Sequence, residues 1–410
     1  MTAPPRRAAL ISAAGQLGGA ERVLLDLAAQ LQHRGRWQPH VVSMAGGPLV
    51  EALTAAGVPV TVLALPPALS AMGEAGRSPL ALAWSVARRA PALRSYAAAM
   101  RDTLRGLRPD IIHANGIKPS LVAAMCMPAG AALIWHLHDY PRARPASARM
   151  MRWLGGRASL VLATSESLAG EARRLLPKAS VEAVLNGIDV GHFAADGPRE
   201  DLDARSNLEP ARPGTIRIGL LATYARWKGH DVFLDALARL PPDAAWRGYV
   251  IGAPVYQTAG SQFSRQQLDT IAGARGLSGR VGFTGFVPDS AAALRALDIV
   301  VHASTAPEPF GLVLAEAMAS GRALVTTATG GSAELVLPDR TALVVAPGDA
   351  GALADAIGRL AGDPGLRRRL GDAGRAHASA AFTRDRFAAA VESCYTRLAG
   401  AGPAGVGRAG

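Results

Sequence analysis

Short apolar segments alternate with longer amphipathic segments along most of the chain. In the first half, apolar runs such as Ala8–Ser12 and Ile111–Ala114 flank stretches with helical spacing, such as Gly19–His33. Apolar runs of this length indicate buried strands, and the amphipathic stretches between them indicate helices on both faces of a parallel sheet. A second alternation of the same kind begins at Ile216. The pattern therefore predicts an α/β protein with two doubly wound, Rossmann-like domains that face a cleft.

The segment between the two alternations marks the predicted domain boundary. Residues 196–213 are polar, lack periodicity and contain several prolines and glycines, which is typical of a linker. A chain of 410 residues is also too long for one ordinary core. We expect an N-terminal Rossmann-like domain (1–200), a C-terminal Rossmann-like domain (201–382), a C-terminal helix that crosses back to the first domain (383–398) and a disordered tail (399–410).

Composition narrows the class of protein. With 49% apolar and 19% charged residues, the chain is typical of a soluble α/β enzyme. Its two cysteines, Cys126 and Cys394, lie far apart, so we expect a reducing cytoplasm and no disulfide or cysteine metal site. Arg6-Arg7 and the apolar residues after them resemble a secretion signal, but the run is short, and we interpret it as the first buried strand. No charge-free run of 18 apolar residues occurs, so no transmembrane helix is expected.

The chain is basic, and its charge is unevenly distributed. The formal net charge is +12; residues 1–200 carry 22 basic and 13 acidic side chains, whereas residues 201–410 carry 22 and 19. The first half should therefore face something anionic. Around 142–157, five arginines interleave with methionines and a tryptophan, which predicts a peripheral contact with the anionic inner face of the cell membrane. The alternative is a packed helix with a solvated arginine face, and no motif indicates a nucleic-acid partner.

The most informative motif lies between a predicted strand and a predicted helix in the second half. Pro307 and Pro309 exclude helix on both sides of Glu308, so Glu308 lies in a loop and the helix begins near Gly311. The free N–H groups of that helix point into the loop and favour an anion such as a diphosphate. Glu316 lies further along the helix, so two carboxylates can accept hydrogen bonds from one polyhydroxy ligand. The alternative is a pair of solvated surface glutamates.

Two further loops carry candidate binding residues. Arg226 and Lys228 follow a predicted strand and can hold phosphate oxygens between them. Lys228 is one of three lysines in an arginine-rich chain. Gly18 and Gly19 lie in a turn after the first strand that matches neither the dinucleotide fingerprint nor a P-loop, so it is interpreted as a wall of the cleft or as a plain turn.

A polar cluster ends another strand of the first half. His136 is expected inside the strand as a buried, satisfied histidine, whereas His138 at the strand end is expected to face a ligand. No third ligand at a metal spacing accompanies them, so no metal site is predicted.

With these motifs in place, the chain resembles family 4 of the retaining glycosyltransferases, which have the GT-B fold, over essentially its whole length. The match is strongest from Glu308 to Glu316 and at the glycine-rich turn Thr329–Glu334. The resemblance implies an acceptor-side first domain and a second domain that binds a nucleotide-diphosphate sugar. It implies catalytic roles for Glu308, His138, Arg226 and Lys228, and donor-binding roles for Gly18, Gly19, Phe310, Gly311, Leu312, Glu316, Phe286 and Val287.

The resemblance also implies the chemistry. We expect retention of configuration through a front-face mechanism in which Arg226, Lys228 and the helix start at Gly311 stabilise the leaving diphosphate. Such a reaction needs no divalent metal and no cofactor beyond the sugar donor. The acceptor is not identified by the sequence; a lipid-linked saccharide, a glycan or a small molecule would each fit. The alternatives are a nucleotide-sugar epimerase and a non-catalytic protein that binds nucleotide sugars or nucleic acid.

Overall fold

The protein folds as two compact units. The structure, a computed structural model, describes residues 5–66, 79–254 and 260–400. The first unit combines Met1–Gly187 with Arg384–Gly410, and the second is Ile188–Thr383. The C-terminal helix thus belongs to the first unit, as the sequence predicted. It ends at Gly400, and residues 401–410 of the predicted tail lie outside the described residues.

The described part of the first unit contains a parallel sheet of seven strands in the order β3-β2-β1-β4-β5-β6-β7. The order reverses between β1 and β4, and loops from both strands leave the carboxyl edge of the sheet at that point. The strands are β1 (Arg6–Ser12), β2 (Trp37–Ser43), β3 (Val60–Val62), β4 (Ile111–Asn115), β5 (Ala132–Leu137), β6 (Leu160–Ala163) and β7 (Val181–Ala183).

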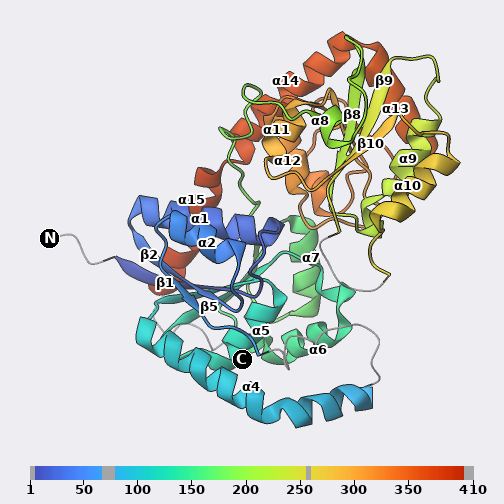
Figure 1. The fold of residues 1–410 in the computed structure, drawn as a ribbon. Coiled ribbons are helices and arrows are strands. Elements are labelled where there is room, and N and C mark those ends of the chain that lie inside the picture. Colours follow the sequence, from blue (N-terminus) through green and yellow to red (C-terminus); the bar gives the residue numbers. More distant parts are fainter. Residues whose placement is uncertain (1–4, 67–78, 255–259, 401–410) are drawn as a thin grey trace. The chain divides into compact units, whose positions relative to one another are not determined.

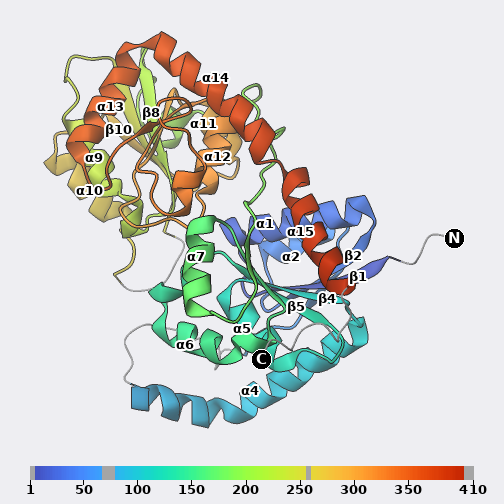
Figure 2. The ribbon, with the colours of Figure 1, turned by 180° about the vertical axis from the view of Figure 1, so that it is seen from behind.

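Helices cover both faces of this sheet (Figures 1 and 2). The helices are α1 (Gly19–Arg34), α2 (Pro48–Ala55), α4 (Pro79–Leu107), α5 (Ile117–Cys126), α6 (Pro145–Leu154), α7 (Glu166–Leu175) and α15 (Arg384–Gly400), with short 3₁₀ turns η1 (Pro141–Ala143) and η2 (Gly155–Arg157). Buried side chains of α4, α5, α6 and α7 share one core with Ala9 and Ile11 of β1. Helix α1 packs against both α2 and α15 on the other face.

The described part of the second unit has a parallel sheet of six strands in the order β10-β9-β8-β11-β12-β13. The strands are β8 (Ile216–Leu221), β9 (Trp246–Ile251), β10 (Val281–Gly285), β11 (Ile299–His302), β12 (Ala323–Thr326) and β13 (Leu343–Val344). The helices are α8 (Leu202–Arg205), α9 (His230–Ala238), α10 (Arg265–Ala274), α11 (Ser290–Arg295), α12 (Leu312–Ala319), α13 (Ala350–Gly362) and α14 (Pro364–Ala381), with 3₁₀ turns η3 (Arg226–Lys228) and η4 (Gly331–Glu334).

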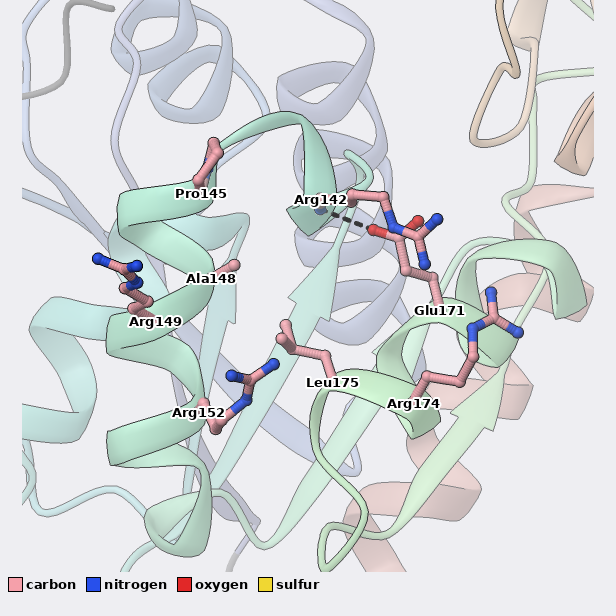
Figure 3. Close-up of a pocket in the computed structure, with 8 residues that line it drawn as sticks. All are labelled: Arg142, Pro145, Ala148, Arg149, Arg152, Glu171, Arg174 and Leu175. Carbon is pink, nitrogen blue, oxygen red and sulfur yellow. Dashed lines mark hydrogen bonds between the residues drawn. The ribbon is translucent and has the colours of Figure 1, made fainter.

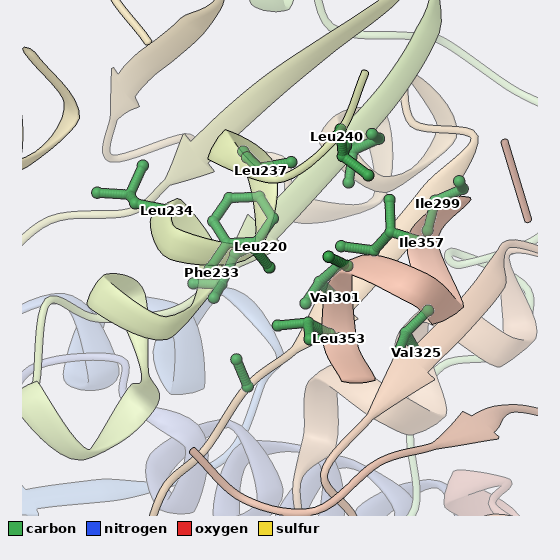
Figure 4. Close-up of a cluster of buried hydrophobic side chains, with 14 of the residues drawn as sticks. Leu220, Phe233, Leu234, Leu237, Leu240, Ile299, Val301, Val325, Leu353 and Ile357 are labelled. Carbon is green, nitrogen blue, oxygen red and sulfur yellow. The ribbon is translucent and has the colours of Figure 1, made fainter. Parts of the chain in front are cut away.

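One apolar cluster holds the second sheet to its helices (Figure 4). Phe233, Leu234 and Leu237 of α9 pack with Leu353 and Ile357 of α13 over the sheet. The strands contribute alternate residues to this cluster, because side chains along a strand point to opposite faces. The packing fixes the carboxyl ends of β8 and β11, from which the candidate site is built.

The units divide at Gly187–Ile188, whereas the sequence predicted a boundary after residue 200. The segment from 188 to 200 is attached to the second unit by backbone groups and not by periodic apolar side chains. The Ile188 N–H donates to Phe382 O at 2.8 Å, and the buried Arg295 guanidinium donates to Ala194 O and Pro198 O. Hydrogen bonds to main-chain carbonyls leave no hydrophobic pattern, so the sequence did not reveal this attachment.

Gly229 joins the loop after β8 to α9 and has no room for a side chain. Its φ is +71°, and a Cβ placed there would lie 1.9 Å from Ala303 O in the neighbouring β11 loop. Gly214 has a similar φ of +82°, but a Cβ there would meet nothing within 4 Å. Left-handed backbone alone costs a non-glycine residue about 1–2 kcal/mol.

We predict that Gly229→Ala lowers the free energy of unfolding of the second unit by about 3 kcal/mol or more, because a steric clash adds to the backbone cost. Gly214→Ala, the matched control, should cost only about 1 kcal/mol. Urea titrations of both variants provide the measurement. Equal losses of unfolding free energy in the two variants would show that the clash with Ala303 does not add to the backbone cost.

Candidate functional site

A buried carboxylate lies at the centre of the candidate site in the second unit. Glu308, in the loop between β11 and α12, is 7% exposed. Lys228 Nζ donates to its Oε1 at 2.5 Å, and His302 Nε2 donates to its Oε2 at 2.6 Å. The Ser304 hydroxyl donates to the same Oε2 at 2.9 Å. Solvated surface glutamates, the alternative considered from the sequence, are therefore excluded for Glu308, and Glu316 is equally buried at 7%.

The partners of Glu308 keep it ionised. Burial by itself raises the pKa of this carboxyl group, but the charges of Lys228 and His302 and their hydrogen bonds outweigh burial, so the pKa is held well below its usual range. His302 is fixed from its other side, where its Nδ1 lies 3.0 Å from the Thr326 hydroxyl of β12. The arrangement presents a fixed cation beside a fixed anion.

Backbone geometry places the start of α12 next to this carboxylate. Gly311 caps α12 with a left-handed φ of +94°, and no side chain caps the helix. The loop is attached to the turn after β12, because Glu308 N donates to Thr329 O and Gly331 N donates to Glu308 O. The Phe310 side chain is buried. The first N–H groups of α12 carry the positive end of the helix dipole.

Arg226 and Lys228 lie in η3 but engage different partners. The Lys228 ammonium approaches Glu308 and lies 4.1 Å from the centre of the Trp227 ring. The Arg226 guanidinium lies 4.3 Å from the centre of the Phe263 ring and donates to Gly260 O at 3.0 Å. A hollow of about 370 Å³ opens between Arg226 and α10. The structure brings Lys228 to Glu308, whereas the Arg226 guanidinium contacts Phe263 and Gly260 instead.

The predicted base-flanking residues follow β10. Phe286 is 63% exposed, whereas Val287 is buried. Gly285 before them has a left-handed φ of +68°, which turns the chain at the end of the strand. An exposed phenyl ring in this position can stack on a planar ligand group.

In the first unit, the glycine turn forms the start of α1. Gly18 is the N-cap of α1, and Gly19 is its first residue. A Cβ on Gly18 would lie 2.8 Å from Glu21 Oε2, so glycine at this position leaves room for the Glu21 carboxylate. Burial raises the pKa of Glu21, and the nearby Asp139 charge raises it further, against the lowering effect of backbone N–H groups of Glu21 and Gly18. Glu21 thus closes the helix start as a capping residue.

His138 is held at the end of β5 by a side chain that the sequence analysis did not identify. Its Nε2 lies 2.7 Å from Asn115 Oδ1 at the end of β4, and Asn115 Nδ2 donates to Ala20 O at 3.0 Å. The Asn115 oxygen is therefore an acceptor, so Nε2 of His138 carries the proton. The neighbouring His136 is fully buried, as predicted, but its Nε2 has no hydrogen-bond partner in the structure.

Behind His138, buried histidines connect the site to the C-terminal helix. His113 Nε2 lies 3.1 Å from His136 Nδ1, and the Tyr395 hydroxyl of α15 lies 2.8 Å from His113 Nδ1. Burial lowers the pKa of His113 and of His138 to about 3 each, and it lowers the pKa of His136 well below the ordinary value of 6.5. All three are therefore neutral at physiological pH.

Several members of both clusters were missed by sequence reasoning. Asn115, His302 and Ser304 are polar residues at or just after the carboxyl ends of buried strands. That position is the signal that could have found them, because ligands of open α/β sheets bind at this edge. Among the described residues, no group of three or more His, Cys, Asp or Glu side chains is placed to hold a metal ion. No helix in the described ranges is long and apolar enough to cross a bilayer.

Both halves of the chain match models of known families. The model "Glycosyltransferase Family 4" matches residues 17–192, and the model "Glycosyl transferases group 1" matches residues 207–377. The lipopolysaccharide core biosynthesis mannosyltransferase LpcC of Rhizobium leguminosarum bv. viciae is 33% identical over 250 residues, which are 61% of this chain and 67% of LpcC. The chain belongs to the group 1, family 4 glycosyltransferases. Family membership supports a transferase over the epimerase and non-catalytic alternatives.

Other similar proteins extend the comparison of this glycosyltransferase. A D-inositol 3-phosphate glycosyltransferase of Xylanimonas cellulosilytica is 33% identical over 229 residues, 55% of this chain and only 53% of that protein. Anabaena HepE, solved with UDP and glucose, is 25% identical, with a TM-score of 0.77 over 95% of this chain and 99% of HepE. The lipopolysaccharide glycosyltransferase WaaG, at 15% identity and a TM-score of 0.66 over 95% of this chain and 99% of WaaG, shares the fold. The GT-B fold is thereby shown.

We predict that the first unit of this glycosyltransferase loses stability as pH falls. The folded pKa values of His113, His136 and His138 lie below 6.5, so the unfolded chain binds more protons below that pH. Stability should be full above about pH 7.5 and should fall by about 4 kcal/mol between pH 7.5 and 5.5, about 1.4 kcal/mol for each of the three histidines.

The measurement is urea unfolding at several pH values, followed by amide hydrogen exchange in β4 and β5. His138→Gln, which keeps a donor for Asn115, should remove about a third of the pH dependence. His192→Gln, at a half-exposed position in the second unit, is the control and should leave it unchanged. A flat profile from pH 7.5 to 5.5 would contradict the neutral histidine cluster.

Proposed function

We propose that this glycosyltransferase transfers a sugar from a nucleotide-diphosphate sugar with retention of configuration and without a divalent metal ion. The observation that carries the proposal is the Lys228–Glu308 pair beside the uncapped start of α12. Only one of the three Lys228 N–H donors is used by Glu308 Oε1, so the ammonium can also bind a phosphate oxygen. Together, a fixed cation and a helix N-terminus supply the charge that a metal ion would otherwise supply.

Similar proteins support the choice of donor. HepE has been solved in complexes with UDP and with UDP-glucose at 25% identity to this chain. Phe286, exposed after β10, is proposed to stack on the nucleotide base, and Val287 to pack beside it. Glu316 on α12 is proposed to accept hydrogen bonds from the ribose, as carboxylates do from hydroxyl groups. The particular nucleotide and sugar are left to a donor screen.

In the proposed mechanism, each residue acts on charge or position. The bond between the anomeric carbon and the diphosphate oxygen breaks, and its electron pair goes to the diphosphate, next to Lys228 and the Phe310–Leu312 backbone. Glu308 orients the Lys228 ammonium and the sugar, and Arg226 binds the outer side of the diphosphate. The departing diphosphate oxygen takes the proton of the acceptor hydroxyl, which attacks the same face of the sugar. The enzyme supplies fixed charges and needs no protein nucleophile.

The acceptor side is assigned to the first unit. His138 is proposed to contact the transferred sugar as a neutral hydrogen-bonding group, because its pKa is lowered to about 3. Gly18 and Gly19 are proposed to allow close approach of the donor phosphates to the start of α1. Relatives named for lipopolysaccharide core and inositol phosphate suggest a saccharide or polyol acceptor. The expected peripheral membrane contact stays a prediction; on α6, Trp153 is 79% exposed and Met150 41%.

We predict that Lys228→Ala and Glu308→Ala each lower kcat by about 100-fold or more with the fold intact, because each removes fixed charge at the reacting centre. The double variant should lose little more than either single variant, since the two residues act as a pair. Lys178→Ala, at an exposed lysine of the first unit, is the control. The measurement is release of the nucleotide from a screened donor. Near-normal turnover of both single variants would contradict the site.

We also predict that removal of divalent ions leaves donor turnover within about twofold of its initial value, because Lys228 and the α12 N-terminus neutralise the diphosphate. The measurement compares initial rates after treatment with a chelator and after addition of magnesium or manganese. Loss of activity with the chelator, and recovery with either ion, would contradict metal independence.

A further inference from the structure

A groove rich in arginine lies between α6 and α7 of the first unit (Figure 3). It encloses about 360 Å³ and shares no residue with the Glu308 and His138 clusters, although three of its arginines belong to the predicted membrane contact around 142–157. Arg142 of η1, Arg149 and Arg152 of α6, and Arg174 of α7 surround it. Pro145, Ala148, Glu171 and Leu175 complete its lining.

The four guanidinium groups of this arginine groove make no hydrogen bond or ion pair with any part of the chain that the structure describes. Neighbouring arginines differ: Arg144 pairs with Asp139 at 3.2 Å, and Arg157 donates to Ala124 O at 2.7 Å. The carboxylate of the groove, Glu171, accepts a hydrogen bond from the Arg142 backbone N–H at 2.7 Å. Four arginines and one carboxylate line the groove, and that carboxylate already holds the start of η1.

Helix geometry explains how these cations come together. Residues 145, 148, 149 and 152 recur at the spacing that places them on one face of α6, and residues 171, 174 and 175 do so on α7. Arg149 and Arg152 lie one turn apart, where like charges repel and destabilise a helix. Arg174 belongs to a different helix, so the arginines of the groove do not all come from one arginine-rich segment of the sequence.

The chemistry of the arginine groove fits a phosphate ester. A guanidinium group can bind two oxygens of one phosphate through paired hydrogen bonds. Surface water molecules do not offer hydrogen bonds in that paired geometry. Ala148 and Leu175 supply an apolar floor for the remainder of such a ligand. The first turn of α6, with Pro145 at its start and no side-chain cap, adds the positive end of a ten-residue helix.

We propose that the arginine groove binds phosphate groups of the acceptor, so that this glycosyltransferase acts on a phosphorylated acceptor. The assignment of the phosphate to an acceptor rests on the proposed function, whereas the anion site itself does not. The phosphate is carried either by a soluble molecule or by a lipid. Met150 and Trp153, exposed on the adjacent face of α6, would contact a lipid surface.

The first experiment measures binding of inorganic pyrophosphate by calorimetry, in a Lys228→Ala background that weakens binding at the donor site. Arg149→Gln with Arg152→Gln should weaken pyrophosphate binding by about tenfold or more, because two charge-assisted contacts are lost. Arg6→Gln with Arg36→Gln is the matched control: both arginines are exposed, and neither side chain makes a hydrogen bond or ion pair with described residues. The control should bind within about twofold of the parent. Equal weakening in both pairs, or in neither, would overturn the proposal.

The second experiment identifies the source of the phosphate and separates this proposal from the proposed function. The full chain is sedimented with phosphatidylcholine vesicles, with and without about 30% phosphatidylglycerol. Vesicle binding that the Arg149/Arg152 variant loses indicates a lipid phosphate, and pyrophosphate binding without vesicle binding indicates a soluble one. Donor hydrolysis without acceptor should be unchanged in this variant. Absence of hydrolysis in the parent protein would count against the proposed function and leave the anion site standing.

Discussion

The buried charge of Glu308 is the constraint on which the candidate site depends. A carboxylate taken out of water must be paired and hydrogen-bonded, and each of its partners must then be held in place. Lys228 comes from the turn after β8, His302 from the end of β11, and Thr326 of β12 holds His302 in turn. One network of ion pairs and hydrogen bonds therefore joins side chains at the ends of three adjacent strands.

The first unit meets the same constraint in a different way. Its strand ends also carry buried polar groups, but these are histidines that burial keeps neutral. A neutral ring needs fewer partners than an ion, and His136 keeps one nitrogen without any partner in the structure. The second unit thus presents fixed charge at the edge of its sheet, while the first presents fixed hydrogen-bonding groups. This difference matches the division between a diphosphate-bearing donor and a hydroxyl-bearing acceptor that we propose.

How much the sequence could predict depended on the range of each interaction. The start of α12 was predictable because Pro309 and Gly311 act within a few residues, and the structure places Gly311 at the N-cap. The contact of Lys228 with Glu308 joins residues 80 positions apart, so no local pattern contains it. Arg174 of α7 also lines the arginine groove, but the sequence analysis identified only the arginines around α6. Helix α14, Pro364–Ala381, was not predicted from the sequence.

The return of α15 to the first unit makes the second unit an insertion within the first. The chain leaves the first unit at Gly187 and re-enters it at Arg384, so the first unit is discontinuous in sequence. During synthesis, β1 to β7 emerge before α15 exists, and the face of α1 that α15 covers stays open until the second unit has been made. Only then can Tyr395 form its hydrogen bond with His113, and only then can Arg34 form its ion pairs with Asp385 and Glu392. The first unit can therefore be completed only after the whole second unit has been translated.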